Sequence, residues 1–127
     1  MKANYQIIEL PQSGVQTTIE GNLLRILFDF KKYEVKTDDE TEAPNDIYDC
    51  ESVDVNGRTY GEIVSAIIND RYNNDSVQAI MANYEDAKDE SSPISDDKRD
   101  EYIYEYNLYQ NFRKHAKEVA KIAVEQI

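Results

Sequence analysis

Two residues of this sequence are of types that serve as nucleophile and base in enzymes. Cys50 is the only cysteine and His115 is the only histidine among the 127 residues. Nucleophilic catalysis would require the two side chains to meet, and no flanking pattern predicts such a contact. A zinc site would need more ligands at a defined spacing. We therefore interpret Cys50 as an unreactive, half-buried thiol and His115 as a helix-face residue, and we predict no catalytic residue, metal or cofactor.

Carboxylates form the second group that could do chemistry. Between Thr37 and Gly57 the chain holds eight acidic residues and no lysine or arginine. A calcium loop needs oxygen ligands at fixed spacing and a glycine at its sharp bend, and the segment TDDETEAPND, residues 37–46, has neither. No flanking pattern singles out a catalytic pair. The segment predicts a solvated acidic loop, with four carboxylates as a candidate contact region for a protein partner: Asp38, Asp39, Glu40 and Glu42.

Tyrosines form the third group, in the stretch YIYEYNLYQNF. Tyr102, Tyr104 and Tyr106 alternate as on a β-strand, but residues 96–126 contain no glycine or proline, which favours a helix. At about 100° per residue, Tyr102, Tyr106 and Tyr109 lie on one face of that helix, and Tyr104 points to nearly the opposite side. The same face continues, in steps of three and four residues, through Phe112, Ala116, Val119 and Ala123.

This tyrosine stripe has two interpretations. It can pack on the apolar face of the predicted sheet, or its first turns can project past the domain and bind a partner. Tyrosine suits the second role because it is large, stiff and amphipathic. Both interpretations stay open, so we name four candidate partner-binding residues: Tyr102, Tyr104, Tyr106 and Tyr109.

The elements that position these groups begin with a predicted antiparallel sheet in residues 1–57. Apolar residues alternate over residues 15–19 and 24–30 on either side of a Gly21-Asn22 turn, which predicts a hairpin with one buried face. The predicted buried residues of its second strand are Leu24, Ile26, Phe28 and Phe30. Further predicted features are a bulge or bend after Lys32, where the apolar parity changes, and strands at residues 5–10 and 47–55.

The rest of the chain predicts helices. Thr59 and Glu62 match a capping box, and Asn73 with its neighbours is predicted to end the first helix and cap the second. The remaining predicted features are an apolar stripe at Val77, Ile80, Met81 and Tyr84, a polar connector at residues 85–94, a cap at Ser95 and a long helix over residues 96–126.

Together these patterns predict one α+β domain that spans residues 1–127. It consists of an N-terminal antiparallel sheet of three to four strands followed by two short helices and one long C-terminal helix. Residues 1–57 are strand-rich, residues 59–127 are helical, and the acidic loop lies at residues 37–46. A chain of this length buries enough surface to fold without a metal or a disulfide.

The overall charge limits the class of partner. Acidic residues number 26 against 14 basic ones, which gives a net charge of −12, and such a chain is repelled by phosphate backbones and anionic membranes. We expect no direct nucleic-acid binding and no membrane association. No apolar run is long enough for a signal peptide or a membrane span, and a single cysteine fits a reducing compartment. The expected location is the cytoplasm, or a particle assembled there.

Two blocks of the sequence carry a resemblance: YGEIVSAIINDRYNNDSVQAIMANYEDA, residues 60–87, and DDKRDEYIYEYNLYQNFRKHAKEVAKIA, residues 96–123. Together with YQIIELPQ and NLLRILFDF, they resemble small uncharacterised proteins encoded by phages and prophages of gut Bacteroidales. The resemblance covers most of the chain and rests on packing and capping patterns. It implies an accessory or structural component of a virion or tail module, and it carries over no catalytic residue.

We therefore expect a non-enzymatic protein that acts through protein–protein contacts, either with copies of itself as a homo-oligomer or with other phage structural proteins. The alternative is a small acidic inhibitor that mimics nucleic acid and binds a basic host protein, because the carboxylates are so numerous. This alternative predicts a salt-sensitive complex with a basic host protein, since contacts between exposed charges weaken as ionic strength rises.

Overall fold

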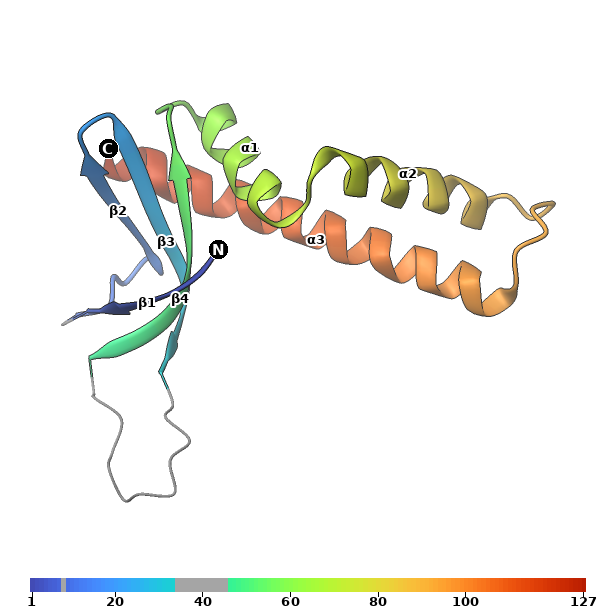
Figure 1. Ribbon diagram of the computed structural model, residues 1–127, viewed down its shortest axis with the longest axis horizontal. Coiled ribbons are helices and arrows are strands. Elements are labelled where there is room, and N and C mark those ends of the chain that lie inside the picture. The colour runs from blue at the N-terminus through green and yellow to red at the C-terminus, as the bar shows by residue number, and fades with distance from the viewer. Residues whose placement is uncertain (8, 34–45) are drawn as a thin grey trace, which may run out of the picture.

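The computed structural model describes residues 1–7, 9–33 and 46–127. It has the predicted α+β architecture, with a four-stranded antiparallel sheet followed by two shorter helices and a long C-terminal helix (Figure 1). Along the chain the elements are β1 (Lys2–Gln6), β2 (Val15–Glu20), β3 (Leu23–Lys32), β4 (Ile47–Val55), α1 (Tyr60–Arg71), α2 (Asn74–Lys88) and α3 (Asp96–Gln126).

The sheet has the strand order β1-β4-β3-β2. The predicted hairpin is confirmed as β2 and β3, which turn at Gly21, whose φ of 60° suits a glycine in a tight turn. The predicted strand at residues 47–55 is confirmed as β4. The prediction at residues 5–10 was misplaced, because β1 occupies Lys2–Gln6, where it pairs antiparallel with β4.

A bulge interrupts β3 upstream of the predicted position, and residues 34–45, which follow the predicted bend after Lys32, lie outside the described residues. The register with β4 shifts between Phe28 and Lys31, and Asp29 has a φ of 56°. The bulge adds one residue to β3, so Phe28 and Lys31, which are three positions apart, pair with β4 residues that are two positions apart. Phe30 therefore does not continue the fully buried row as predicted, and it is half-buried. The predicted contact region at Asp38, Asp39, Glu40 and Glu42 lies outside the described residues.

Side-chain caps set the helix boundaries. Thr59 and Glu62 form the predicted capping box of α1, and Asn73 and Ser95 cap α2 and α3 by accepting hydrogen bonds from backbone N–H groups. The predicted connector at residues 85–94 was too long, because α2 continues to Lys88. These caps fix where the chain reverses between α2 and α3.

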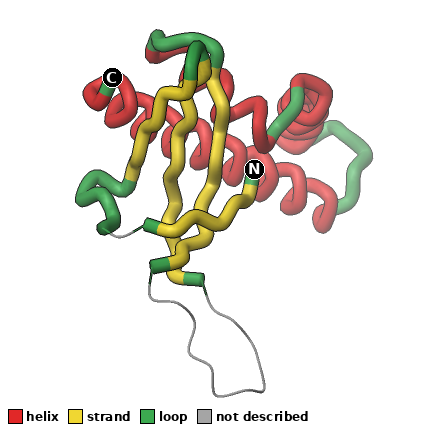
Figure 2. The backbone as a smooth tube through the Cα atoms, turned by 60° about the vertical axis from the view of Figure 1, so that its left-hand side comes forward, coloured by secondary structure: helices red, strands yellow, loops and turns green. Residues whose placement is uncertain are grey.

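The core lies between one face of the sheet and two helices, α1 and the C-terminal half of α3 (Figure 2). From Phe112 to Ala123, the continuation of the tyrosine stripe packs there against the sheet face that includes Leu24, Ile26 and Phe28, which agrees with the first of its two interpretations. The core residues contributed by α3 are Phe112, Ala116, Val119, Ala120 and Ala123. Small side chains at this contact let the helix lie close to the strands.

The N-terminal half of α3 has a different neighbour. It extends past the sheet and runs beside α2, so that the two helices form a hairpin projecting from the sheet (Figure 1). We call α2, its connector and residues 96–108 the arm. Within the part of the chain that the structure describes, no helix combines the length and apolar character needed to cross a membrane.

Candidate functional site

One arginine links the two helices by hydrogen bonds at the far end of the arm. Arg99, in the first turns of α3, donates from Nη1 to the carbonyl oxygens of Ala87 at 2.6 Å and Asp89 at 3.1 Å. Asp89 in turn accepts hydrogen bonds from the side chain and the backbone of Ser91, which lower its pKa below the ordinary value. The arginine satisfies carbonyls at the end of α2 that have no partner within that helix.

Stacked aromatic rings hold the middle of the arm. Tyr106 of α3 lies face to face on Tyr84 of α2, with ring centroids 3.6 Å apart and an interplanar angle of 3°. Lys88 places its ammonium group 5.0 Å from the Tyr84 centroid. The predicted site residue Tyr106 is therefore half-buried against the chain's own second helix, rather than against the sheet or a partner.

A second aromatic cluster joins the arm to the core. Tyr72, at the end of α1, contacts Tyr109 edge-on at 5.1 Å and Phe112 at 5.7 Å between centroids. Arg71 lies 4.0 Å above the Phe112 ring, and both rings on α3 are buried. Tyr109 is thus a packing residue, so a role in partner binding would require displacing Tyr72.

Three large apolar side chains of the arm are exposed to solvent, and Met81 of α2 is one of them at 38%. Tyr104 is 64% exposed and Leu108 is 45% exposed, and they lie one turn apart on α3. Tyr102 is half-buried, with the Lys98 ammonium group 5.8 Å from its ring centroid. Leu108 also lines a groove of about 440 Å³, together with Arg71, Tyr72, Ser76, Ala79, Ile80 and Glu105. Among the predicted tyrosines, Tyr104 is the one that the fold leaves most available to a partner.

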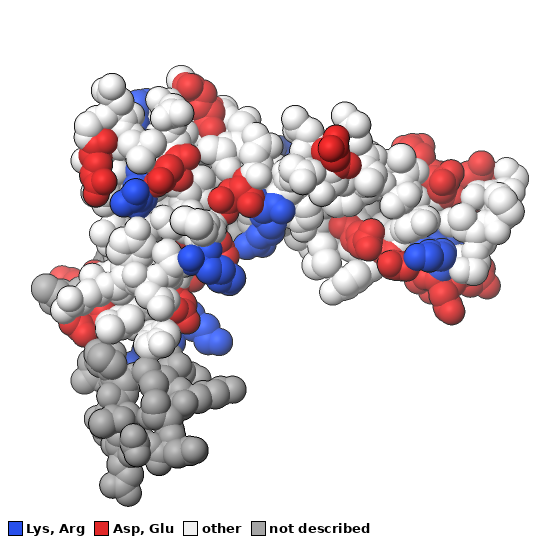
Figure 3. All heavy atoms as spheres, in the orientation of Figure 1, with Lys and Arg blue, Asp and Glu red and all other residues white. Residues whose placement is uncertain are grey.

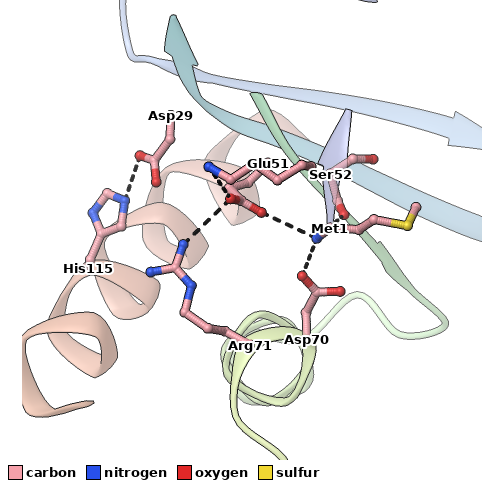
Figure 4. A network of polar contacts seen from close by, with 8 residues as sticks. Met1, Asp29, Glu51, Ser52, Asp70, Arg71 and His115 are labelled. Atoms are coloured by element: carbon pink, nitrogen blue, oxygen red, sulfur yellow. Dashed lines mark hydrogen bonds and ion pairs between the residues drawn. The ribbon is translucent and has the colours of Figure 1, made fainter. Parts of the chain in front are cut away.

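A polar network fills the corner where the arm meets the sheet (Figure 4). Glu51, a buried residue of β4, pairs with Lys2 at 3.2 Å, with the Met1 amino group at 3.3 Å and with Arg71 at 3.6 Å. The Met1 amino group also contacts Asp70 of α1. Burial alone would raise the pKa of Glu51, but the hydrogen bonds from Lys2 and the amino group outweigh it and lower that pKa.

Of the two residues whose types could serve as nucleophile and base, His115 pairs with a carboxylate and Cys50 is a buried free thiol. His115 Nε2 lies 2.8 Å from Asp29 Oδ1, and its ring meets Phe28 edge-on. Cys50 is 3% exposed, and burial together with nearby carboxylates raises the pKa of its thiol. A thiol with a raised pKa is a weak nucleophile at neutral pH. Within the described residues, no three His, Cys, Asp or Glu side chains gather in a way that could hold a metal ion.

Charge is distributed unevenly between the arm and the corner. Residues 74–105 carry ten acidic and three basic side chains. Figure 3 shows acidic side chains gathered toward the far end of the arm and basic ones where the arm leaves the sheet. In that corner a hollow of about 620 Å³ is lined by Lys2, Ala3, Asn4, Asp29, Lys31, Asp49 and Cys50. The corner therefore has a surface of mixed charge, whereas the surface of the arm is predominantly acidic.

Sequence reasoning missed how the arm is built. The helical spacing of Tyr84 and Tyr106 was recognised on each segment separately, yet nothing in either pattern says that they face one another. Arg99 was overlooked, although an arginine in the first turn of a helix is unusual because the helix dipole disfavours a cation there. Comparisons with protein-family models, curated proteins and solved structures found no match for this chain.

Proposed function

We propose that this protein is a non-enzymatic structural or accessory component that acts through protein–protein contacts made by its arm. The observation that supports this proposal is the exposure of Tyr104 and Leu108 on a helical hairpin that projects from the sheet. An exposed tyrosine beside an exposed leucine costs solvation free energy in an isolated chain, and aromatic anchors of this kind are enriched at interfaces. The arm presents them away from the core.

The resemblance to Bacteroidales phage proteins supports a more specific version of the proposal. The protein is then a virion or tail accessory component, made in the cytoplasm of the host cell and assembled with its own copies or with other phage structural proteins. A folded, projecting hairpin suits such a role because its contact residues are already arranged before binding, which reduces the entropy lost on association.

Site-specific photo-crosslinking in the cells that produce the protein tests this proposal. A photoreactive phenylalanine analogue replaces Tyr104 or Leu108 in the arm, and a control variant carries it at Ile19 of β2, which is 55% exposed. The expected result is one defined crosslinked protein from both arm positions and none from the control position. If neither arm position yields a crosslinked protein, the arm is not the contact surface and the proposal is wrong.

A second candidate function follows from the charge of the arm. Its ten carboxylates against three basic residues could imitate the phosphate backbone of a nucleic acid and block a basic host protein. This complex would be weakened by salt because its contacts are screened. Capture from host lysate at low ionic strength should then recover a basic protein that elutes as salt is raised, and recovery of none argues against this function.

A further inference from the structure

One face of α3 is exposed along the whole helix. Its residues follow one another in steps of three and four, opposite the buried side that packs on the sheet and on α2. Nine exposed residues form this outer face: Asp97, Asp100, Tyr104, Asn107, Asn111, Lys114, Glu118, Lys121 and Glu125. Steps of three and four residues keep these side chains on one side of α3, where a second helix could contact several of them.

The chemistry of the outer face changes along its length. The N-terminal end carries Asp97 and Asp100, with Glu101 beside them. The C-terminal half carries Lys114, Lys117 and Lys121 against Glu118 and Glu125, which leaves one net positive charge. Between the two ends the outer face is uncharged. Its central side chains are Tyr104, Asn107 and Asn111, with Leu108 alongside. An uncharged centre that separates an acidic end from a half with more lysines than carboxylates gives partial charge complementarity to a second copy that runs in the opposite direction.

We propose that the outer face of α3 binds the same face of a second copy of this chain, antiparallel and related by a two-fold axis that passes between Asn107 and Asn111. This inference rests on the proposed function, and it names the partner. In such a pair each residue meets the one equally distant on the other side of the axis. The resulting favourable contacts are Asp97 with Lys121, Glu101 with Lys117, Tyr104 with Lys114, and Asn107 with Asn111.

The balance of contacts favours this arrangement over its alternatives. The pairing of Asp100 with Glu118 is repulsive. Two ion pairs and one cation–π contact oppose it, and the two-fold symmetry repeats each of these contacts. A parallel pair would instead place Asp97 on Asp97 and Lys121 on Lys121. Paired asparagines at the centre fix the alignment, as single buried asparagines do in coiled coils. The sheet lies on the opposite side of α3 (Figure 2), which leaves the outer face open to a second helix.

The proposed dimer is held mainly by exposed charges, so it should be salt-sensitive and of moderate affinity. Analytical ultracentrifugation of the full chain at low ionic strength, at roughly 100 µM, detects it if the Kd is near the micromolar range. The expected result is a dimer that dissociates as salt is added. A chain that remains monomeric under these conditions overturns the inference.

Charge exchange tests the predicted contacts without touching the core. One variant carries Lys117→Glu and Lys121→Glu, and the other carries Asp97→Lys and Glu101→Lys. Each alone replaces four ion pairs of the dimer by like-charge contacts and should weaken it by roughly tenfold or more. Mixing the two should give a heterodimer, since every reversed residue then meets an opposite charge. A chain with all four substitutions should again form a homodimer of nearly native affinity.

The outcomes separate this inference from the proposed function. Restoration by charge exchange supports the antiparallel pair, because a variant that merely unfolds cannot be rescued by a second reversal. A dimer that ignores all four reversals uses another surface, and the inference is then wrong. If the chain is monomeric while arm crosslinking captures a different protein, the inference fails and the proposed function stands. If crosslinking captures nothing and the chain is monomeric, both fail.

Discussion

The two halves of α3 lie in one continuous helix but are held in different ways. The C-terminal half packs small residues, among them Ala116 and Ala120, against a sheet and α1, and it belongs to the core. The N-terminal half has one neighbour, α2, and is held by stacked rings and by Arg99 at the far end. The transition falls at Tyr109 and Phe112, where Tyr72 and Arg71 pack on the helix.

This difference teaches that a single helix can serve both as core and as presented surface. The core half has contacts distant in sequence on several sides, whereas the arm depends on one neighbouring helix. Segments with few buried apolar contacts open at lower free energy than the rest of a domain. We therefore expect the arm to open locally while the sheet stays folded, and the predictions that follow try to break or sharpen that distinction.

The largest effect is expected in the core half. Phe28→Ala removes a ring of β3 that is 2% exposed and lies beneath α3. The lost burial and the cavity should reduce the free energy of unfolding by about 3–5 kcal/mol. Urea denaturation followed by circular dichroism measures this change. A loss below about 1 kcal/mol, the scale of a surface substitution, would mean that the core does not depend on this contact.

A smaller and local effect is expected in the arm. Tyr106→Ala removes the ring stacked on Tyr84 and should cost roughly 0.5–1.5 kcal/mol beyond the lost apolar burial. Amide hydrogen exchange should show faster exchange in α2, with the β3 and β4 amides unchanged. Tyr106→Phe is the matched control, because it keeps the stack. Equal acceleration in the sheet would show that the arm and the core unfold as one unit.

The junction between the halves should respond to acid through Glu51. Its pKa is lowered in the folded state, so its stabilisation is complete above the ordinary value of 4.5 and is lost as the pH falls through the lower folded value. At neutral pH, Glu51→Gln should be less stable than the unmodified chain, and this gap should close as the pH drops below 4.5.

Urea denaturation midpoints measured across that pH range compare Glu51→Gln with the unmodified chain. The control variant is Glu9→Gln, at an exposed position. At neutral pH the control variant should match the unmodified chain, because Glu9 is exposed. A stability gap for Glu51→Gln that is independent of pH would show that the charge of Glu51 does not hold the junction together.

Much of this architecture was predictable because its signals are local. The hairpin at Gly21, the Thr59–Glu62 capping box and the limits of α3 each depend on residues close in sequence. The position of the β3 bulge was not predictable, since Asp29 adopts a positive φ that the alternation of apolar residues does not reveal. The partial burial of Tyr106 was not predictable either, because it depends on where α2 folds back, which is a tertiary property.

We expect the smallest effect on stability at Tyr104. A substitution there is also the sharpest test of the difference between the two halves of α3. If the tyrosine stripe only bound a partner, replacing Tyr102 and Tyr106 together by alanine would weaken assembly and leave the fold intact. The contact between Tyr106 and Tyr84 now predicts that such a change also loosens the arm, so it would confuse binding with folding. Tyr104 is 64% exposed and two residues away on another face of the same helix.

Tyr104→Ala should therefore change the free energy of unfolding by no more than about 0.5 kcal/mol, as surface substitutions do. Denaturation and hydrogen exchange should match the unmodified chain, whereas partner capture through a photoreactive group at Leu108 should fall. Tyr106→Ala should show the opposite pattern, with a clear loss of protection of the arm's amides against hydrogen exchange. If Tyr104→Ala instead destabilises α2, the exposed ring is part of how the arm is held, and the two halves of α3 differ less than their contacts indicate.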